Sequence, residues 1–499
     1  MSGVSFNQIP GDIRVPLFYA EVDNSQANTA QESLRRLIIA QVNDDADSED
    51  IGRLVLVSRT TQATLIGGQG SMLAAMHKRL RAIDVMGEVW CLPLKVETGT
   101  AAKATVTVTG VATESGLLYL YVGGKRVRSI VTAQASAASV AAALAKAIND
   151  DIDLPVTAAA AEAVVTLTCK FKGELGNDLV VLMNRLGRAN GEFTPSGLTV
   201  TATAMAGGAG TPEMSVALAA LGDEPFEFIA QPWTDPATLD AWKATMDESS
   251  GRWSWSKQLY GHVYTAKRGT LGQLVAAGRV RNDPHISIGG FEKSLPQPVW
   301  EVAAQFMART AVFISADPAR PTQSGELGAI QSASASDRFL IDESQSLLTN
   351  GIATFSSTGG SVRIQRAITT YQRNAYGQVD DSYLDSEPLH QSAHVIRFLR
   401  TRITSKYGRH KLANDGTNFG PGQAIVTPSV IRGELIAAYG ELERAGLVEN
   451  AEMFKANLIV ERDPNNPSRL NILFPPDLVN QLRVFALLYQ FRSQYPEAA

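Results

Sequence analysis

The chain has 499 residues, of which 44% are hydrophobic and 19% are charged, and its formal net charge at pH 7 is −5. This length fits roughly two to four globular domains, and the slightly acidic balance argues against a broad nucleic-acid-binding surface. Cys91 and Cys169 have neither metal-ligand nor redox spacing, so we expect two buried thiols in a reducing compartment. We find no signal peptide and no apolar run of transmembrane length, so we expect no direct membrane insertion.

Residues 1–25 are expected to form an extended arm, and residues 26–97 the first part of an α/β domain. Prolines disfavour a helix in the arm, and alternate residues are apolar there. Apolar residues at helical spacing predict a helix over about 29–41. A buried strand at 53–60, a helix after the glycines that begin at Gly67 and a further strand at 87–94 complete a strand–helix–strand unit.

Residues 98–208 differ sharply in composition from the rest of the chain. They are rich in Ala, Thr, Val and Gly and contain none of the six tryptophans. Alternating segments predict several strands, and one Ala-rich helix is predicted at 136–150. We therefore expect a mostly-β domain inserted into the α/β domain, with a Gly-rich exit at 207–214.

The α/β pattern resumes over 209–375, which we expect to form the second part of a central α/β layered domain. Strand and helix patterns alternate through much of this stretch, although 314–351 is less regular. Residues 376–499 are expected to form an α+β carboxy-terminal domain with helices at 388–406 and 428–445.

The carboxy-terminal end predicts strands at 454–463, 469–478 and 482–491. The last of these segments, like the amino-terminal arm, is apolar at a chain end, and such a strand aggregates unless a neighbour covers it. We expect at least one arm to pair with the carboxy-terminal sheet of another subunit, formed around 454–474. The candidate arm residues are Ile13, Val15, Leu17, Phe18, Val484, Phe485, Leu487, Tyr489 and Phe491.

The motifs that carry chemistry are weak in this chain. The glycines at 67–70 match neither a dinucleotide fingerprint nor a P-loop, so a tight strand–helix turn is favoured over a phosphate site. His390 and His394 have the spacing of two zinc ligands, but Gln391 stands where a metalloprotease needs glutamate, so packing histidines are favoured. No nucleophile elbow occurs. We expect no catalytic residue, no cofactor and no metal.

Segments along nearly the whole chain resemble the contractile bacteriophage tail sheath family, and its Mu-like branch in particular. Residues 12–27 (DIRVPLFYAEVDNSQA), 67–76 (GGQGSMLAAM) and 87–94 (GEVWCLPL) resemble the amino-terminal portion of that branch. Residues 349–374 are similar to the segment that leads into the carboxy-terminal domain, and 460–491 to the closing strands.

The insert adds to this resemblance through KGELGND at 172–178 and a run that ends in AMAGGAG at 204–210. Both are similar to the protruding domain of such sheaths. The resemblance implies a central domain that is subtilisin-like in fold only, without protease activity.

The resemblance further implies a structural subunit that polymerises as stacked rings or a helix around a tail tube and contracts to drive the tube through the host envelope. Its partners would be further copies of itself, the tail tube protein, and the baseplate and tail terminator proteins. Its place would be the virion tail, assembled in the host cytoplasm. A sheath of a bacteriocin or secretion-type contractile machine remains an alternative. More remote are an α/β hydrolase with an accessory β domain and a surface-binding module.

One basic segment is unusual in this acidic chain, because no acidic residue occurs between Glu387 and Asp415. The segment is either a solvated basic helix or a lumen-facing surface that meets an acidic tube. Screened charge attraction would suit a contact that must release on contraction. The candidate tube-contact residues are Arg397, Arg400, Arg402, Lys406, Arg409 and Lys411.

Overall fold

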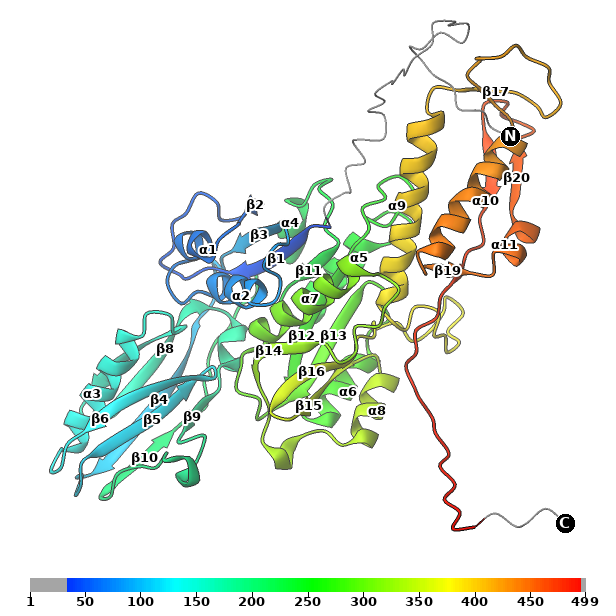
Figure 1. The fold of residues 1–499 in the computed structure, drawn as a ribbon. Helices are drawn as coiled ribbons and strands as arrows, with labels where there is room; N and C mark the ends of the chain where they lie inside the picture. The colour runs from blue at the N-terminus through cyan, green and yellow to red at the C-terminus, as the bar shows by residue number, and fades with distance from the viewer. Residues whose placement is uncertain (1–33, 495–499) are drawn as a thin grey trace, which may run out of the picture.

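The computed structural model describes residues 34–494, which are organised around a nine-stranded sheet (Figure 1). Its strands are β1 (Arg36–Gln41), β2 (Val55–Leu56), β3 (Val89–Leu94), β11 (Phe228–Ala230), β12 (His262–Gly269), β13 (Ile286–Glu292), β14 (Glu326–Gln331), β15 (Ala353–Thr358) and β16 (Ser361–Arg366). They lie in the order β14-β16-β15-β13-β12-β11-β1-β3-β2. The neighbours from β15 to β3 pair parallel, whereas β14, β16 and β2 pair antiparallel at the edges.

Helices cover both faces of this sheet, so the sheet separates two apolar cores. The helices are α1 (Thr60–Gly67), α2 (Met72–Arg81), α4 (Met214–Ala219), α5 (Pro236–Met246), α6 (Leu271–Arg279), α7 (Val299–Ala316) and α8 (Ile341–Thr349). Alternate β1 side chains enter the two cores: Ile38 packs with the α1, α2 and α7 side, and Leu37 with the α4, α5, α6 and α8 side. The result is an α/β arrangement of layers.

The helix predicted over about 29–41 is wrong for its described part, because residues 36–41 form β1. All six β1 residues are buried, and the strand has parallel neighbours on both sides, β11 and β3. A strand buried on both faces is apolar at consecutive positions. Such a run contains the helical spacing by coincidence, and periodicity alone does not separate the two structures.

The segment between β3 and α4 forms a unit of its own strands at one end of the molecule (Figure 1). Its elements are β4 (Ala101–Gly110), β5 (Gly116–Val122), β6 (Lys125–Val131), α3 (Ala137–Asp150), β7 (Val156–Ala161), β8 (Val164–Lys172), β9 (Val181–Met183) and β10 (Leu198–Ala202). They make a four-stranded sheet, β10-β4-β8-β7, and a three-stranded sheet, β6-β5-β9. The chain enters and leaves side by side, since Thr100 and Ala209 exchange backbone hydrogen bonds of 3.0 and 3.1 Å.

The carboxy-terminal part surrounds a third apolar core beside the nine-stranded sheet. Its elements are α9 (Glu387–Tyr407), β17 (Lys411–Leu412), β18 (Ile425–Val426), α10 (Pro428–Arg444), β19 (Val448–Glu449), α11 (Ala451–Asn457), β20 (Ile459–Arg462), β21 (Leu470–Leu473) and β22 (Asp477–Leu478). The strand predicted over 454–463 is wrong in its first half, which belongs to α11. The strand predicted over 482–491 has no strand partner among residues 34–494.

Candidate assembly site

The two histidines at zinc-ligand spacing have different surroundings. His390 is buried, with Nδ1 2.5 Å from a Glu227 carboxylate oxygen and Nε2 2.8 Å from the Tyr264 hydroxyl. Burial lowers the pKa of His394, and Arg397 lowers it further. Within the described part of the chain, no three His, Cys, Asp or Glu side chains come together as metal ligands. Protein groups therefore occupy both ring nitrogens of His390.

A histidine–serine pair that the sequence spacing did not reveal lies inside the central sheet. His262 Nε2 is 2.8 Å from Ser287 Oγ, the arrangement that a base and a nucleophile would adopt. Both residues are fully buried, and burial holds the pKa of His262 well below its usual value. A substrate has no route to this pair, so we interpret it as a polar contact of the core.

The glycines that precede α2 make a tight turn against protein atoms. Gly68 and Gly70 have φ values of +88° and +74°, which side chains rarely adopt. A Cβ on Gly70 would lie 2.3 Å from the Leu154 carbonyl oxygen, and one on Gly68 would lie 2.6 Å from Asn43 Nδ2. Protein atoms therefore occupy the positions that side chains at Gly68 and Gly70 would need, as a tight strand–helix turn requires.

Exposed apolar side chains gather in the carboxy-terminal arm, residues 479–494. The arm leaves the body as an extended segment (Figure 1). From Val484 onward its large apolar side chains have exposed fractions of 74–84%, and they are Val484, Phe485, Leu487, Leu488, Tyr489 and Phe491. Consecutive exposed side chains of this size are a contact site or an aggregation hazard. The predicted arm residues Ile13, Val15, Leu17 and Phe18 lie outside the described residues.

A second unpartnered feature is the hairpin of β20 and β21. The two strands pair antiparallel from Ile459↔Leu473 to Arg462↔Leu470, and they form a sheet of their own. Three of its apolar side chains are substantially exposed: Ile459 (50%), Ile472 (43%) and Leu473 (56%). Val460 and Leu470 pack the hairpin against the core of α10, and its open strand edges can accept a further strand.

Some of the basic residues of α9 form ion pairs within the chain. Arg402 and Lys406 both pair with the carboxylate of Glu434 on α10, and Arg402 also pairs with Glu441. Burial opposes the ionisation of Glu434, but hydrogen bonds from Lys406, Arg402 and Tyr407 outweigh it and lower its pKa to about 2. These charges therefore hold α9 against α10.

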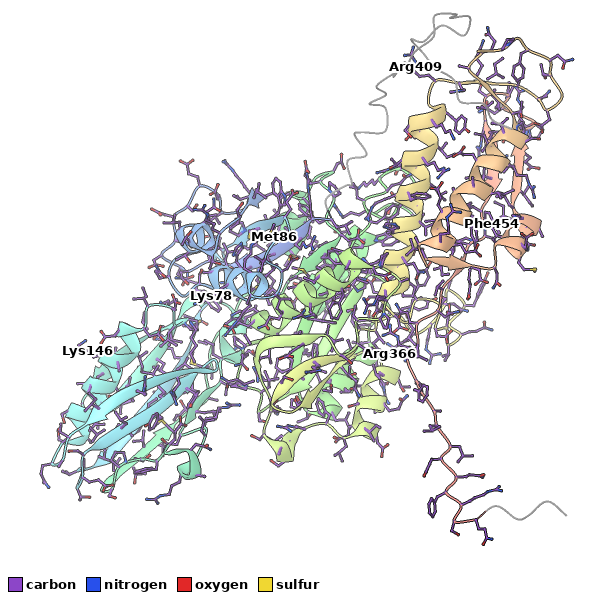
Figure 2. The ribbon with its side chains drawn as sticks, in the orientation of Figure 1. Lys78, Met86, Lys146, Arg366, Arg409 and Phe454 are labelled. Carbon is purple, nitrogen blue, oxygen red and sulfur yellow. The ribbon has the colours of Figure 1, made fainter. Side chains whose placement is uncertain are left out.

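The remaining four basic residues have different positions. Arg397 is half-buried and pairs with Glu227, so it connects α9 to the central sheet. Arg400, Arg409 and Lys411 are exposed, and Lys411 Nζ donates a 3.1 Å hydrogen bond to Gln423. Figure 2 shows Arg409 just beyond the end of α9 that points away from the central sheet. Arg397, Arg402 and Lys406 thus pair with Glu227 or Glu434, although the Lys406 side chain is itself 56% exposed, and Arg400, Arg409 and Lys411 lie at exposed positions.

Comparison with known proteins decides what these features belong to. Residues 207–370 match the family model of the phage tail sheath protein central domain, and residues 378–492 match the phage tail sheath C-terminal domain. The Mu-like prophage FluMu tail sheath protein of Haemophilus influenzae is 41% identical over 491 residues, which cover 98% of this chain and 99% of that protein. The chain belongs to the phage tail sheath protein family.

Solved sheath structures align with this chain at low sequence identity. A sheath tail protein from Desulfitobacterium hafniense aligns with a TM-score of 0.50 and 13% identity, covering 94% of this chain and 97% of that one. The helical sheath of the anti-feeding prophage in its contracted state aligns with a TM-score of 0.48 and 11% identity, covering 97% and 100% of the two chains. The first of these alignments shows a common mixed α/β, multi-domain fold.

As a phage tail sheath protein, the chain is a structural subunit of a virion tail and not an enzyme. The resemblance to the Mu-like branch, the mixed α/β multi-domain fold and the structural role predicted from the sequence are all confirmed. Among residues 34–494, none of the helices combines the length and apolar character that crossing a bilayer requires.

Proposed function

We propose that this sheath protein polymerises helically around a tail tube through strand exchange, and that the polymer contracts to drive the tube through the host envelope. Two features of the same chain support strand exchange: an apolar arm that no other strand covers among residues 34–494, and a hairpin, β20–β21, with open strand edges. An arm that adds to a neighbour's hairpin would be covered and would pair with an open edge.

Such a contact is heterologous, because the arm of one subunit meets the hairpin of the next. Repeating a heterologous contact gives a ring or an open helical polymer, which is the geometry that a sheath needs. The apolar side chains of Val484, Phe485, Leu487, Tyr489 and Phe491 would be covered in the polymer. We expect the amino-terminal arm to take part as well, so removal of residues 1–20 should give monomers with an intact fold.

The energy for contraction would come from assembly itself. A polymer trapped in a metastable arrangement can convert irreversibly once the barrier is crossed, without a nucleotide. Stoichiometric ATP hydrolysis during contraction would contradict this mechanism.

The tube contact would be carried by the exposed basic residues Arg400, Arg409 and Lys411, facing an acidic tube. The two α9 residues paired with Glu434 would act indirectly, because they hold α9 in place. Exposed charges suit this contact, since screened attraction gives complementarity without a deeply apolar interface that could not release.

We propose the following domain boundaries for this sheath subunit. The units would be the arm at 1–25, the α/β domain at 26–97 and 209–375, the protruding insert at 98–208 and the carboxy-terminal domain at 376–499. The central layers would resemble subtilisin in fold only. Assembly would occur in the host cytoplasm, with baseplate and tail terminator proteins at the polymer ends. The identity to the Mu-like prophage sheath favours a phage tail over a bacteriocin or secretion machine.

Negative-stain microscopy of the purified chain tests this proposal. We expect hollow, striated tubes whose number rises with protein concentration, and longer tubes when tail tube protein is added. A protein that stays monomeric at every concentration, alone and with tube protein, would contradict polymerisation as its function.

A further inference from the structure

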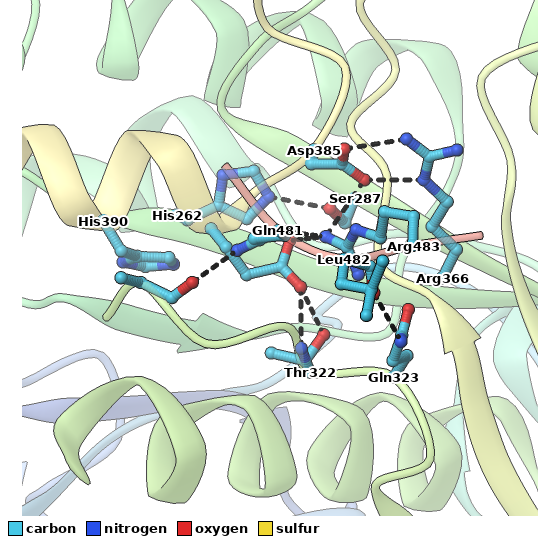
Figure 3. A network of polar contacts seen from close by, with 12 residues as sticks. His262, Ser287, Thr322, Gln323, Arg366, Asp385, His390, Gln481, Leu482 and Arg483 are labelled. Carbon is cyan, nitrogen blue, oxygen red and sulfur yellow. Dashed lines mark hydrogen bonds and ion pairs between the residues drawn. The ribbon is translucent and has the colours of Figure 1, made fainter. Parts of the chain in front are cut away.

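The root of the carboxy-terminal arm is held by the body at one charged residue. Arg483 has only 12% of its side chain exposed, whereas its neighbours Leu482 and Val484 are 69% and 78% exposed. Its Nη2 lies 3.0 Å from Glu387 Oε2 and 3.3 Å from Asp385 Oδ1 (Figure 3). In an extended chain alternate side chains point to opposite sides, so Arg483 points inward where the flanking apolar residues point outward.

The two carboxylates that receive Arg483 are themselves fixed by the central domain. Glu387 is fully buried at the first turn of α9, and its Oε1 accepts hydrogen bonds from the Thr322 amide and hydroxyl at 2.9 and 2.7 Å. Asp385 accepts two hydrogen bonds of 2.8 Å from Arg366 at the end of β16. Burial and these partners leave the carboxylates little freedom to follow a moving arm.

Two neutral contacts secure the same stretch of the arm. Gln481 Nε2 donates to the Ala319 carbonyl oxygen at 3.3 Å, and Gln323 Nε2 donates to the Leu482 carbonyl oxygen at 3.1 Å. Two parts of the body therefore meet the arm here: the loop at 319–323, and the stretch from Asp385 to Glu387 that begins α9. Figure 3 shows how these side chains converge around the arm.

A charged anchor has a property that an apolar anchor would lack. The arm from Leu482 to Phe491 is apolar at most positions, so one apolar side chain could replace another if the segment slipped. Arg483 is the only charged residue between Asp477 and Arg492. A slip by one residue would turn it outward and leave Glu387 buried without this cation, which is costly. The ion pairs therefore specify a single register.

We propose that Arg483 is the positioning residue of the carboxy-terminal arm: it fixes the point and the direction in which the arm leaves the body and connects the arm to the start of α9. This inference rests on the proposed strand exchange, because a strand can reach a neighbour's hairpin only from a defined exit. The ion pair between Arg483 and Glu387 also links the arm mechanically to α9. A force on the arm would be transmitted to the first turn of this helix, whose other end lies near the exposed basic residues.

A distance measurement on the monomer tests the positioning role independently of assembly. Spin labels are placed on Phe485→Cys in the arm and Gln345→Cys on α8; the native Cys91 and Cys169 are buried. Double electron–electron resonance should give one narrow distance distribution for the otherwise unchanged chain. Arg483→Met should broaden it, and Arg483→Lys should restore part of the narrow component. Arg320→Met removes an exposed charge from the loop that carries Thr322 and should leave the distribution narrow.

A second variant separates positioning from stability. Arg483→Met leaves the buried Glu387 carboxylate without its cation. Glu387→Gln removes that negative charge, while the amide oxygen of the glutamine still accepts from Thr322. The double variant Arg483→Met/Glu387→Gln should recover most of the lost melting temperature and still show the broad distribution. If either Arg483→Met variant is as narrow as the unchanged arm, or if the unchanged arm is itself broad, Arg483 does not position it.

Polymer formation is then scored for the same variants. Arg483→Met should form fewer and shorter tubes than Arg320→Met, with partial recovery in Arg483→Lys. If the unsubstituted chain forms no tubes, strand exchange is wrong, while the distance distributions still decide whether Arg483 fixes the arm. Normal tubes from Arg483→Met with a broadened monomer would mean that arm direction does not govern assembly, and this would overturn the functional part of the inference.

Discussion

The ring of Phe171 on β8 meets the ring of Trp300 on α7 edge to face, with the ring centroids 5.7 Å apart. Both side chains are buried, and they belong to one continuous apolar core that includes residues of the inserted unit and of the central sheet. Asp178 strengthens the same junction: it pairs with Arg268 at 2.7 Å and accepts from the Val299 amide at 2.8 Å. The insert is therefore packed on the central domain and not merely tethered to it.

Deletion of residues 99–207 tests how far the two units depend on each other. The nine-stranded sheet should survive, because all its strands lie outside the deletion and the segments that enter and leave the insert are hydrogen-bonded to each other next to the cut, between Thr100 and Ala209. The protein should still polymerise. Its melting temperature should fall, because the deletion removes the Phe171–Trp300 contact and the Asp178–Arg268 ion pair. Thermal unfolding and negative-stain microscopy provide the two measurements.

Two matched substitutions control that deletion. Phe171→Ala should destabilise the full chain strongly, whereas Phe193→Ala, at a side chain that is 41% exposed in the same unit, should have little effect. Combining the deletion with Trp300→Ser removes the apolar surface that the deletion uncovers and should improve solubility. Collapse of the central domain in both deletion variants would show that the insert is integral to the fold.

Composition and periodicity predicted the main units of the fold, because abrupt changes in residue type and long amphipathic helices leave local signals. The helices α9 and α10 lie within one residue of their predicted ranges, and Thr427 caps α10 by accepting from the Val430 amide. The errors occurred where one local sequence pattern fits both a helix and a strand. β1 reads as a helix because a strand buried on both faces has no polar alternation.

The assembly features were predicted unequally. Exposed apolar residues at the carboxy-terminal end could be suspected from their position alone, since chain ends rarely bury a run of large side chains. The division of the basic residues could not be foreseen, because Glu434 lies 28 residues from Lys406 in sequence and meets it only after α9 and α10 pack. Arg483 shows the same limit, as its carboxylates lie in the turn before α9 and in α9 itself.

Glu434→Gln tests the contact between α9 and α10. The folded pKa of about 2 lies below the usual value of 4.5, so ionised Glu434 stabilises the fold above pH 4.5 and loses this effect as the pH falls toward 2. The variant should lower the unfolding free energy at pH 7 by about 1–3 kcal/mol. The unfolding free energy of the variant should also change less between pH 4.5 and 2 than that of the unsubstituted chain. Chemical denaturation at each pH measures this difference.

The control for this substitution is Glu441→Gln, since Glu441 also pairs with Arg402 but is 45% exposed. An exposed ion pair contributes about 0–1 kcal/mol, so this variant should be close to the unsubstituted chain at every pH. Equal effects of the two substitutions would mean that burial of Glu434 is not what makes its ion pairs matter.

Charge reversal at Arg400, Arg409 and Lys411 tests the proposed tube contact. These side chains are exposed, so the fold should tolerate glutamate at all three positions. We expect the triple variant to lose assembly templated by tube protein while it still forms sheath-only polymers. The unsubstituted chain should lose templated assembly as salt rises, because the attraction is screened. Unchanged assembly on tubes across the salt series would remove the tube contact from this surface.

Arg402 and Lys406 are unsuitable for that experiment, although they belong to the same basic segment. Glutamate at either position would face the Glu434 carboxylate, whose side chain is only 7% exposed. Repulsion there should separate α9 from α10 and lower the melting temperature, so a loss of assembly would report misfolding. The melting temperature of each reversal variant therefore separates a tube-contact residue from one that holds the fold.

The central claim is that subunits join through the carboxy-terminal arm, and the most direct measurement is the assembly state of a chain truncated after Arg483. This truncation removes the exposed apolar residues and keeps the ion pairs at the root of the arm. Sedimentation velocity, with negative-stain images of the same samples, should show striated tubes for the full chain and folded monomers with an unchanged melting temperature for the truncated one. Tubes of normal diameter and length from the truncated chain would contradict the account.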